Sequence, residues 1–255
     1  MAAASVDWGL TGKSVIVTGA SSGIGAATAR ALGAAGASVL LVGRDATRLA
    51  EQAEAVESGG GEAQMASVDL EDLDATAGLA DRAVEAFGSL HGIVHTASLF
   101  DPLPLADTSY ESMEQQWRTN VAAPLLLTKA ALPHLREGAS IVFIGSTTGS
   151  VGFPGCSAYT ATKGAVNSVA RALAVEFAPN GVRVNIVVPG YIRTPMLQPH
   201  LDANEGYEEW ILGRTPMARI GGPHEVSSSI LFMLSPLSEY VDGATLVADG
   251  GWIAQ

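Results

Sequence analysis

The sequence predicts an α/β protein, one domain of residues 1–255 built on a doubly wound parallel sheet of about seven strands with helices on both faces. Two patterns indicate this architecture. Short β-branched runs alternate with longer alanine-rich stretches along the whole chain, and most of the short runs are apolar on both faces, as buried parallel strands must be. The composition agrees, because 47% hydrophobic and 16% charged residues in 255 allow a large core.

The elements follow one another in a regular order. The expected strands are residues 14–18, 38–42, 63–69, 93–96, 140–145, 182–188 and 244–249. Helical periodicity covers residues 24–35, 46–57, 72–87, 111–136, 157–178 and 224–234. Asp45 stands where it can cap the second helix, and Pro223 occupies a first-turn position of the last helix. The weakly patterned segment 191–222 is predicted to be a lid over the substrate site.

Charge and apolar content exclude several classes of partner. The formal net charge of −12 opposes binding to nucleic acid or to an anionic membrane, and no stretch approaches the ~18 apolar residues of a membrane span. The N-terminal "MAAASVDWGLTGKS" has no basic region and does not resemble a signal peptide. Cys156 is the single cysteine, so no internal disulfide forms. A cytoplasmic protein is expected.

A glycine-rich turn joins the first expected strand to the first helix. In "SVIVTGASSGIG", residues 14–25, the strand runs into Gly19, and Gly23 and Gly25 open the helix. The missing Cβ atoms permit a tight turn, and the helix N-terminus offers free N–H groups to a pyrophosphate. The spacing is G-x-x-x-G-x-G rather than the common G-x-G-x-x-G. This position predicts a dinucleotide site.

Tyr159 and Lys163 lie one helical turn apart in "CSAYTATKGAV", with only small residues between them. A free tyrosine has a pKa near 10, and a nearby ammonium favours the phenolate, which lowers that pKa toward the range useful for acid–base catalysis. Taken alone, the pair could also be a packed aromatic ring beside a lysine whose amine reaches solvent.

The glycine turn and the Y-x-x-x-K pair together resemble the short-chain dehydrogenase/reductase family, in its single-domain branch, from about residue 11 to 252. Further matches occur in the family's order: Asn120 in "WRTNVAAP", Ser146 in "IVFIGSTTGS", "PGYIRTP" at 189–195 and "DGATLVADGG" at 242–251. The resemblance implies a Rossmann-like fold and an NAD(P)-dependent oxidoreductase that acts on a ketone or a secondary alcohol.

The resemblance also implies roles for four residues. Tyr159 would donate the proton to the carbonyl oxygen in reduction, and Lys163 would lower the tyrosine pKa and hold the nicotinamide ribose. Ser146 would polarise the substrate oxygen, and Asn120 would hold a water that connects Lys163 to solvent. The expected cofactor residues are Gly19, Ser21, Ser22, Gly23, Ile24, Gly25, Arg44, Asp69, Leu70, Ala97, Tyr159, Lys163, Pro189, Gly190, Ile192 and Thr194.

The end of the second strand favours NADP over NAD. Gly43 stands where NAD enzymes of this kind place a carboxylate, and the Arg44 that follows suits a 2′-phosphate, with Ser22 and Arg48 as helpers. Asp45 leaves NAD possible, although we interpret it as a helix cap. The alternatives are therefore an NAD-dependent secondary-alcohol or polyol dehydrogenase and, in another class, a non-catalytic nucleotide-binding regulator.

The residues expected around the substrate are mostly apolar, which indicates an uncharged, hydrophobic ketone or secondary alcohol. They are Thr148, Phe153, Cys156, Tyr191, Met196, Leu197 and Trp210. The family also implies a homo-oligomer, a tetramer or dimer, packed through helices 111–136 and 157–178.

The sequence departs from the family after the fourth strand, where His95-Thr96-Ala97-Ser98 replaces the usual Asn-Asn-Ala-Gly. Ser98 adds a Cβ where the backbone passes the cofactor. His95 is interpreted as a hydrogen-bonded structural histidine, because no histidine shows metal-ligand spacing and no metal is expected.

Overall fold

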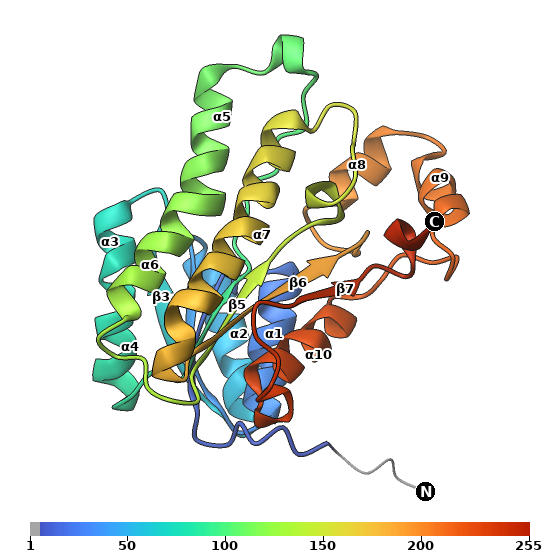
Figure 1. The fold of residues 1–255 in the computed structure, drawn as a ribbon. Helices are drawn as coiled ribbons and strands as arrows, with labels where there is room; N and C mark the ends of the chain where they lie inside the picture. Colours follow the sequence, from blue (N-terminus) through green and yellow to red (C-terminus); the bar gives the residue numbers. More distant parts are fainter. Residues whose placement is uncertain (1–5) are drawn as a thin grey trace, which may run out of the picture.

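Seven parallel strands form one sheet in the computed structural model, which describes residues 6–255 (Figure 1). Their spatial order is β3-β2-β1-β4-β5-β6-β7. The strands are β1 (Ser14–Thr18), β2 (Ser38–Gly43), β3 (Glu62–Ser67), β4 (Gly92–His95), β5 (Ser140–Ile144), β6 (Arg183–Pro189) and β7 (Thr245–Ala248). The chain order reverses between β1 and β4, and a reversal of this kind opens a ligand crevice at the carboxyl ends of the strands. The first five residues of the N-terminal stretch considered above lie outside the described part.

The helices cover both faces of the sheet, as predicted. They are α1 (Gly23–Ala34), α2 (Ala46–Ser58), α3 (Leu73–Ala77), α4 (Leu79–Phe87), α5 (Tyr110–Trp117), α6 (Ala123–Ala131), α7 (Ser157–Phe177), α8 (Gln198–Ala203), α9 (Tyr207–Arg214) and α10 (Pro223–Leu234). Successive residues of a strand point to opposite faces. Ile16 therefore packs with α4, α6 and α7, whereas Val15 and Val17 pack with α1, α2 and α10.

Two of the expected helices are interrupted. The stretch 111–136 is divided into α5, a π-helical turn at Arg118–Ala122, and α6, which ends at Ala131. Pro124, in the first turn of α6, has no N–H to donate to the preceding turn. The stretch 72–87 divides at Gly78 into α3 and α4. The expectation of two continuous helices was wrong because side-chain periodicity does not register a local change in backbone hydrogen bonding.

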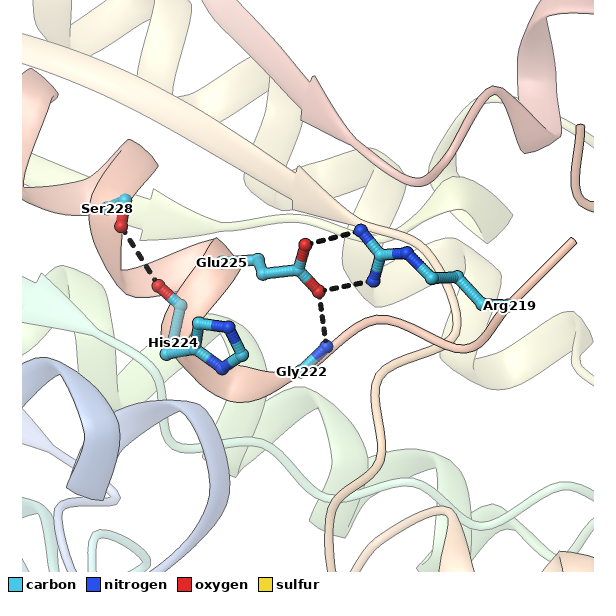
Figure 2. A network of polar contacts seen from close by, with 5 residues as sticks. All are labelled: Arg219, Gly222, His224, Glu225 and Ser228. Atoms are coloured by element: carbon cyan, nitrogen blue, oxygen red, sulfur yellow. Dashed lines mark hydrogen bonds and ion pairs between the residues drawn. The ribbon is translucent and has the colours of Figure 1, made fainter. Parts of the chain in front are cut away.

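The 191–222 segment carries α8 and α9, and its two ends are joined to each other. Ile192 and Gly221 form an isolated parallel bridge, in which Arg193 N donates to Gly221 O and Gly221 N donates to Tyr191 O, both at 2.9 Å. Arg219 holds Glu225 through two 2.6 Å contacts, and Glu225 Oε2 accepts from Gly222 N at 2.8 Å (Figure 2). The segment is thus anchored to the N-terminus of α10 at its exit.

Two sequence predictions about helix starts are confirmed. Asp45 caps α2 by accepting a 3.0 Å hydrogen bond from Arg48 N, and Pro223 is the first residue of α10. Across residues 6–255, none of the helices combines the length and the apolar character needed to cross a membrane.

Candidate active site

The glycine-rich turn lies where β1 meets α1, against the backbone that follows β4. A Cβ on Gly25 would lie 2.3 Å from Gly19 O, and a Cβ on Gly19 would lie 2.9 Å from the Ala97 backbone. Only glycine fits at these positions, and Gly19 also has a φ of +66°. Ser22, the N-cap of α1, makes no side-chain cap bond to the first turn. The N-terminus of α1 is therefore available to an anion.

A hollow of about 260 Å³ runs along this turn and adjoins a larger cavity of about 640 Å³. The smaller hollow contains these predicted cofactor residues: Gly19, Ser21, Ser22, Gly23, Ile24, Gly25, Arg44, Asp69, Leu70, Ala97 and Thr194. The others, Tyr159, Lys163, Pro189, Gly190 and Ile192, line the larger cavity. Ile24, Thr96, Ser98, Thr194 and Met196 line both, so the two spaces form one continuous crevice.

Charged side chains stand at the outer end of the smaller hollow. Arg44 Nη1 lies 3.7 Å from Asp69 Oδ2, and both side chains are at least half exposed. Such a pair is weak, so the Arg44 guanidinium can exchange this partner for a phosphate at little cost. Arg48 Nε is held by Asp45 Oδ2 at 2.7 Å, and the hydrogen bonds from Arg48 lower the pKa of Asp45. Arg48, which the sequence suggested as a helper of Arg44, is thus paired with Asp45 and does not line the smaller hollow.

Tyr159, Lys163 and Ser146 all line the larger cavity. Tyr159 and Lys163 project from α7 and are both buried, whereas Ser146 follows β5. Lys163 Nζ donates to Ile144 O at 2.9 Å and lies 5.5 Å from the centre of the Tyr159 ring. Ser146 Oγ accepts from Thr148 Oγ1 at 3.0 Å and from Thr148 N at 3.3 Å. Neither of these two bonds uses the Ser146 proton, which can be donated to the Tyr159 phenol oxygen or to a substrate oxygen beside it.

The pKa of Tyr159 differs in direction from the sequence expectation. Burial raises the pKa of Tyr159 to about 12, although hydrogen bonds with Ser98 and Ser146 oppose the rise. Burial also lowers the pKa of Lys163 to about 8. The expectation that the ammonium lowers the tyrosine pKa is therefore corrected. Burial of the phenol is the largest cause of the rise, and the Lys163 ammonium donates its hydrogen bond to the Ile144 carbonyl.

Asn120 lies in the π-helical turn and is buried beside the crevice, without lining either hollow. Its Oδ1 accepts from Leu99 N at 2.7 Å and from Ser98 Oγ at 3.1 Å. Its Nδ2 donates to Leu99 O at 2.9 Å and to Thr162 Oγ1 at 3.1 Å. Asn120 thus connects the loop after β4 to α7, next to Lys163.

Two of the residues at 95–98 that differ from the family's usual sequence, His95 and Ser98, have different roles in the structure. His95 is the structural histidine that was predicted: its Nε2 is hydrogen-bonded to Thr128 Oγ1 at 3.0 Å, its ring packs on Phe143, and burial lowers its pKa to about 3. Ser98 is a site residue whose contact with Tyr159 sequence reasoning missed. It lines both hollows and reaches Asn120 and the Tyr159 phenol. Its departure from the family pattern was the signal.

All seven residues predicted for the substrate pocket line the larger cavity: Thr148, Phe153, Cys156, Tyr191, Met196, Leu197 and Trp210. The cavity also contains Phe100, His200 and Tyr207, which the sequence did not indicate. The ring centre of Phe100 lies 4.8 Å from that of Tyr159, so an apolar surface adjoins the phenol. Burial raises the pKa of Cys156, which keeps its thiol neutral. Within the described residues, no group of three or more His, Cys, Asp and Glu side chains is placed to hold a metal ion.

The chain is similar to known proteins over nearly its whole length. Residues 19–253 match the family model described as enoyl-(acyl carrier protein) reductase. The chain is 36% identical to 2,5-dichloro-2,5-cyclohexadiene-1,4-diol dehydrogenase of Sphingobium indicum, over 96% of this chain and 98% of that protein. It is also 36% identical to cyclopentanol dehydrogenase of Comamonas testosteroni, over 95% and 97%. A crystal structure of a short chain dehydrogenase from Burkholderia cenocepacia in complex with NADP superposes with a TM-score of 0.90 at 33% identity, covering 95% of this chain and 98% of that one.

Proposed function

The chain belongs to the short-chain dehydrogenase/reductase family of NAD(P)-dependent oxidoreductases of alcohols and ketones, and from this premise we propose that it uses NADP(H). We infer that its substrates are an uncharged, hydrophobic cyclic ketone and the corresponding secondary alcohol. One observation carries the proposal. The crevice that begins at the glycine turn continues into a cavity where Tyr159, Lys163 and Ser146 face mostly apolar and aromatic side chains.

The smaller hollow fits a dinucleotide. A Cβ on Gly19 or Gly25 would meet the protein's own backbone, so the turn after β1 stays tight beside the hollow, as expected of a turn that binds a pyrophosphate. Ser21 and Ser22 lie at the N-terminus of α1, and Thr194 and Ile192 lie where the larger cavity begins. The bound cofactor would supply or accept the hydride.

The residues of the larger cavity would then donate the proton and bind the substrate oxygen. Tyr159 is neutral at pH 7 and can donate its proton to the carbonyl oxygen in reduction. Ser146, whose oxygen already accepts two hydrogen bonds, would donate to the same oxygen. Lys163 would hold the cofactor ribose, and Asn120 would keep Lys163 and Ser98 in place through its contacts with Thr162 and Leu99.

Two relatives support a cyclic substrate. Both are named as dehydrogenases of ring alcohols, a chlorinated cyclohexadiene diol in one and cyclopentanol in the other. Rings of this size fit a cavity of about 640 Å³ lined by Phe153, Tyr191 and Trp210. Such a substrate needs few polar contacts, because Tyr159 and Ser146 would hydrogen-bond the oxygen on its reacting carbon.

The test is the absorbance of reduced cofactor at 340 nm, with purified protein, NADPH or NADH, and a panel of cyclic ketones. We expect oxidation of NADPH in preference to NADH. Tyr159→Phe should reduce turnover by about 10²–10⁴-fold while leaving NADPH affinity within about threefold, since it removes the proton donor alone. Undiminished turnover in that variant would contradict the catalytic role of Tyr159.

The NAD-dependent alternative, which the sequence left open at Asp45, now has support from Asp69, because Asp45 is occupied as the cap of α2. The Asp69 carboxylate lies 3.7 Å from Arg44 and would oppose a 2′-phosphate. Preference for NADH in the same assay would favour this alternative, and cofactor binding without turnover of any ketone or alcohol would favour a regulator.

We also propose that residues 1–255 form one domain with the 191–222 segment as a lid. The protein would be a cytoplasmic homo-oligomer, a dimer or tetramer packed through the helical stretches 111–136 and 157–178. The exposed side chains on α5 include Tyr110 and Trp117, and Val175 is exposed on α7. These exposed side chains offer apolar area to a second copy. Light scattering on the purified protein measures the assembly.

A further inference from the structure

Five aromatic rings gather at the far end of the substrate cavity, and they come from four separate segments. Phe153 follows β5, Tyr191 follows β6, Tyr207 and Trp210 belong to α9, and Trp252 opens the C-terminal 3₁₀ turn Trp252–Ala254. Four of these residues line the cavity. Trp252 does not line it and is only 6% exposed, so it lies behind the other rings.

Trp252 contacts three of the cavity-lining rings. Its ring centre lies 4.9 Å from Tyr191, 5.3 Å from Trp210 and 6.1 Å from Phe153. The Phe153 contact is nearly parallel, at 17°, and the other two are edge-to-face, at 65° and 61°. These are the favourable arrangements of aromatic pairs. The positions of three rings that face the substrate therefore depend on one ring that does not touch it.

The C-terminal turn is itself held in one place. The Asp249 carboxylate accepts from Gly251 N at 2.8 Å and from Ile253 N at 2.9 Å, and Met217 N donates to Gly250 O at 3.1 Å. Gly250 and Gly251 both have positive φ values, +66° and +89°, which glycine adopts at no steric cost. The turn is thus tied to the backbone that follows α9.

Arg214 adds a second connection between α9 and the turn. Its guanidinium carbon lies 5.4 Å from the ring centres of both Trp210 and Trp252. A guanidinium over two indole rings is attracted to each of them. The distance between these two tryptophans is therefore maintained from outside the cavity.

We propose that Trp252 is a positioning residue that sets the depth of the substrate pocket, by holding Phe153, Tyr191 and Trp210 against a hydrophobic ring substrate. This inference rests on the proposed function for the identity of the ligand. When the indole is removed, the three rings lose a shared contact and can move back into the vacated volume. The pocket then becomes deeper, a compact ring loses contact, and a larger ring is accommodated.

The experiment compares cyclopentanone with the bicyclic 2-decalone in the wild type, Trp252→Phe and Trp252→Ala. For each protein, kcat and KM with NADPH are measured by absorbance, and ketone binding to the NADP-loaded protein is measured by calorimetry. We expect Trp252→Ala to change the ratio of the two KM values by roughly tenfold in favour of 2-decalone, with kcat within about threefold, because such pockets discriminate by about 10–200-fold per methylene. Trp252→Phe should restore most of the wild-type ratio.

Trp8→Ala is the matched control, since Trp8 packs against the core that α1 and α10 share and does not line the cavity. It should lower the melting temperature without changing the KM ratio. Equal changes for the two ketones in Trp252→Ala, or an unchanged ratio, would overturn the inference. If Trp252→Ala does not fold, an unchanged KM ratio in Trp252→Leu, which also removes the aromatic ring, overturns the inference as well. A wild-type protein that binds the ketones without reducing them would refute the proposed function. The ratio of the two ketone dissociation constants, compared between the wild type and the Trp252 variants, would still test the role of Trp252.

Discussion

At the scale of single residues, the site depends on how burial acts on Tyr159 and Lys163. Both side chains lie within the protein, where a charge is poorly solvated, so the phenol keeps its proton more strongly and the amine less strongly than in water. A neutral phenol is the form that donates a proton to a carbonyl oxygen. The site as described is therefore prepared for reduction at neutral pH.

Lys163→Met should remove activity and raise stability. Below pH 8 the protein must keep a buried ammonium charged, and this penalty declines as pH rises from about 8 toward the usual 10.5, because the folded state there binds fewer protons than the unfolded state. Met removes the penalty but leaves the Ile144 carbonyl without its donor, so the net gain should be of the order of 1 kcal/mol at pH 7.

Urea denaturation at pH 7 and pH 10 measures this effect. The gain in free energy of unfolding should be smaller at pH 10 than at pH 7. Lys129→Met is the control, since Lys129 is exposed on α6 and should show no such pH dependence. A Lys163→Met protein that is less stable than the wild type at pH 7 would contradict the prediction.

Ser98→Gly restores the family's usual residue and tests the contact between Ser98 and Tyr159. The hydrogen bond with Ser98 lowers the pKa of Tyr159, so its loss should raise that pKa further. Alcohol oxidation requires the phenolate, and its rate at pH 8 should fall by about two- to tenfold, the value of one hydrogen bond.

The pH profile of kcat for oxidation gives the check, with its acid limb moved to higher pH in Ser98→Gly. Ser98→Thr retains the hydroxyl and should restore the wild-type profile. An identical profile for Ser98→Gly and the wild type would mean that the Ser98–Tyr159 contact has no part in catalysis.

Arg44→Asp tests the choice of cofactor. If Arg44 holds the 2′-phosphate, its replacement by a carboxylate should raise the KM for NADPH by about 10–100-fold, as expected for one hydrogen bond to a charged group, and should leave the KM for NADH nearly unchanged. Arg48→Ala is the control, because Arg48 is already occupied by Asp45. Equal effects on the two cofactors would contradict the assignment.

At the scale of elements, the β1–α1 turn can form only because Gly25 has no side chain where its backbone packs against the Gly19 carbonyl. Gly25→Ala would place a Cβ 2.3 Å from the Gly19 carbonyl oxygen, a backbone atom that cannot move without opening the turn. We expect a loss of about 1–3 kcal/mol in stability, as for other overpacked sites, and a loss of NADPH binding, measured by thermal unfolding and by calorimetry.

Gly213→Ala is the contrasting variant for the turn. Gly213 lies in α9, and a Cβ there would meet nothing within 4 Å. This change should be neutral or stabilise the protein by about 0.4–1 kcal/mol, because alanine has fewer unfolded conformations than glycine. Wild-type NADPH affinity in Gly25→Ala would contradict the steric argument.

At the scale of the whole molecule, the crevice is a product of strand order. The reversal between β1 and β4 places the turn after β1 beside the loop after β4, and β5 and β6 bring Ser146 and Tyr191 to the same edge of the sheet. The 191–222 segment and the C-terminal turn then complete the cavity from residues that are distant in sequence. The proposed catalytic residues, cofactor turn and substrate pocket thus lie at the same end of the sheet, because all the strands run in the same direction.

The sequence by itself determined the order and type of the strands and the position of the glycine turn, since periodicity and glycine placement act locally. It also predicted that Tyr159, Lys163 and Ser146 belong to one site, because helical spacing and the family's order of motifs are visible in one chain, and all three line the larger cavity. The tertiary structure decided what depends on packing between distant segments. Burial reversed the expected direction of the Tyr159 pKa, Ser98 approached both Asn120 and the phenol, and Trp252 came to lie behind the substrate cavity. Solvation and contact geometry are properties of the assembled fold, and no local pattern encodes them.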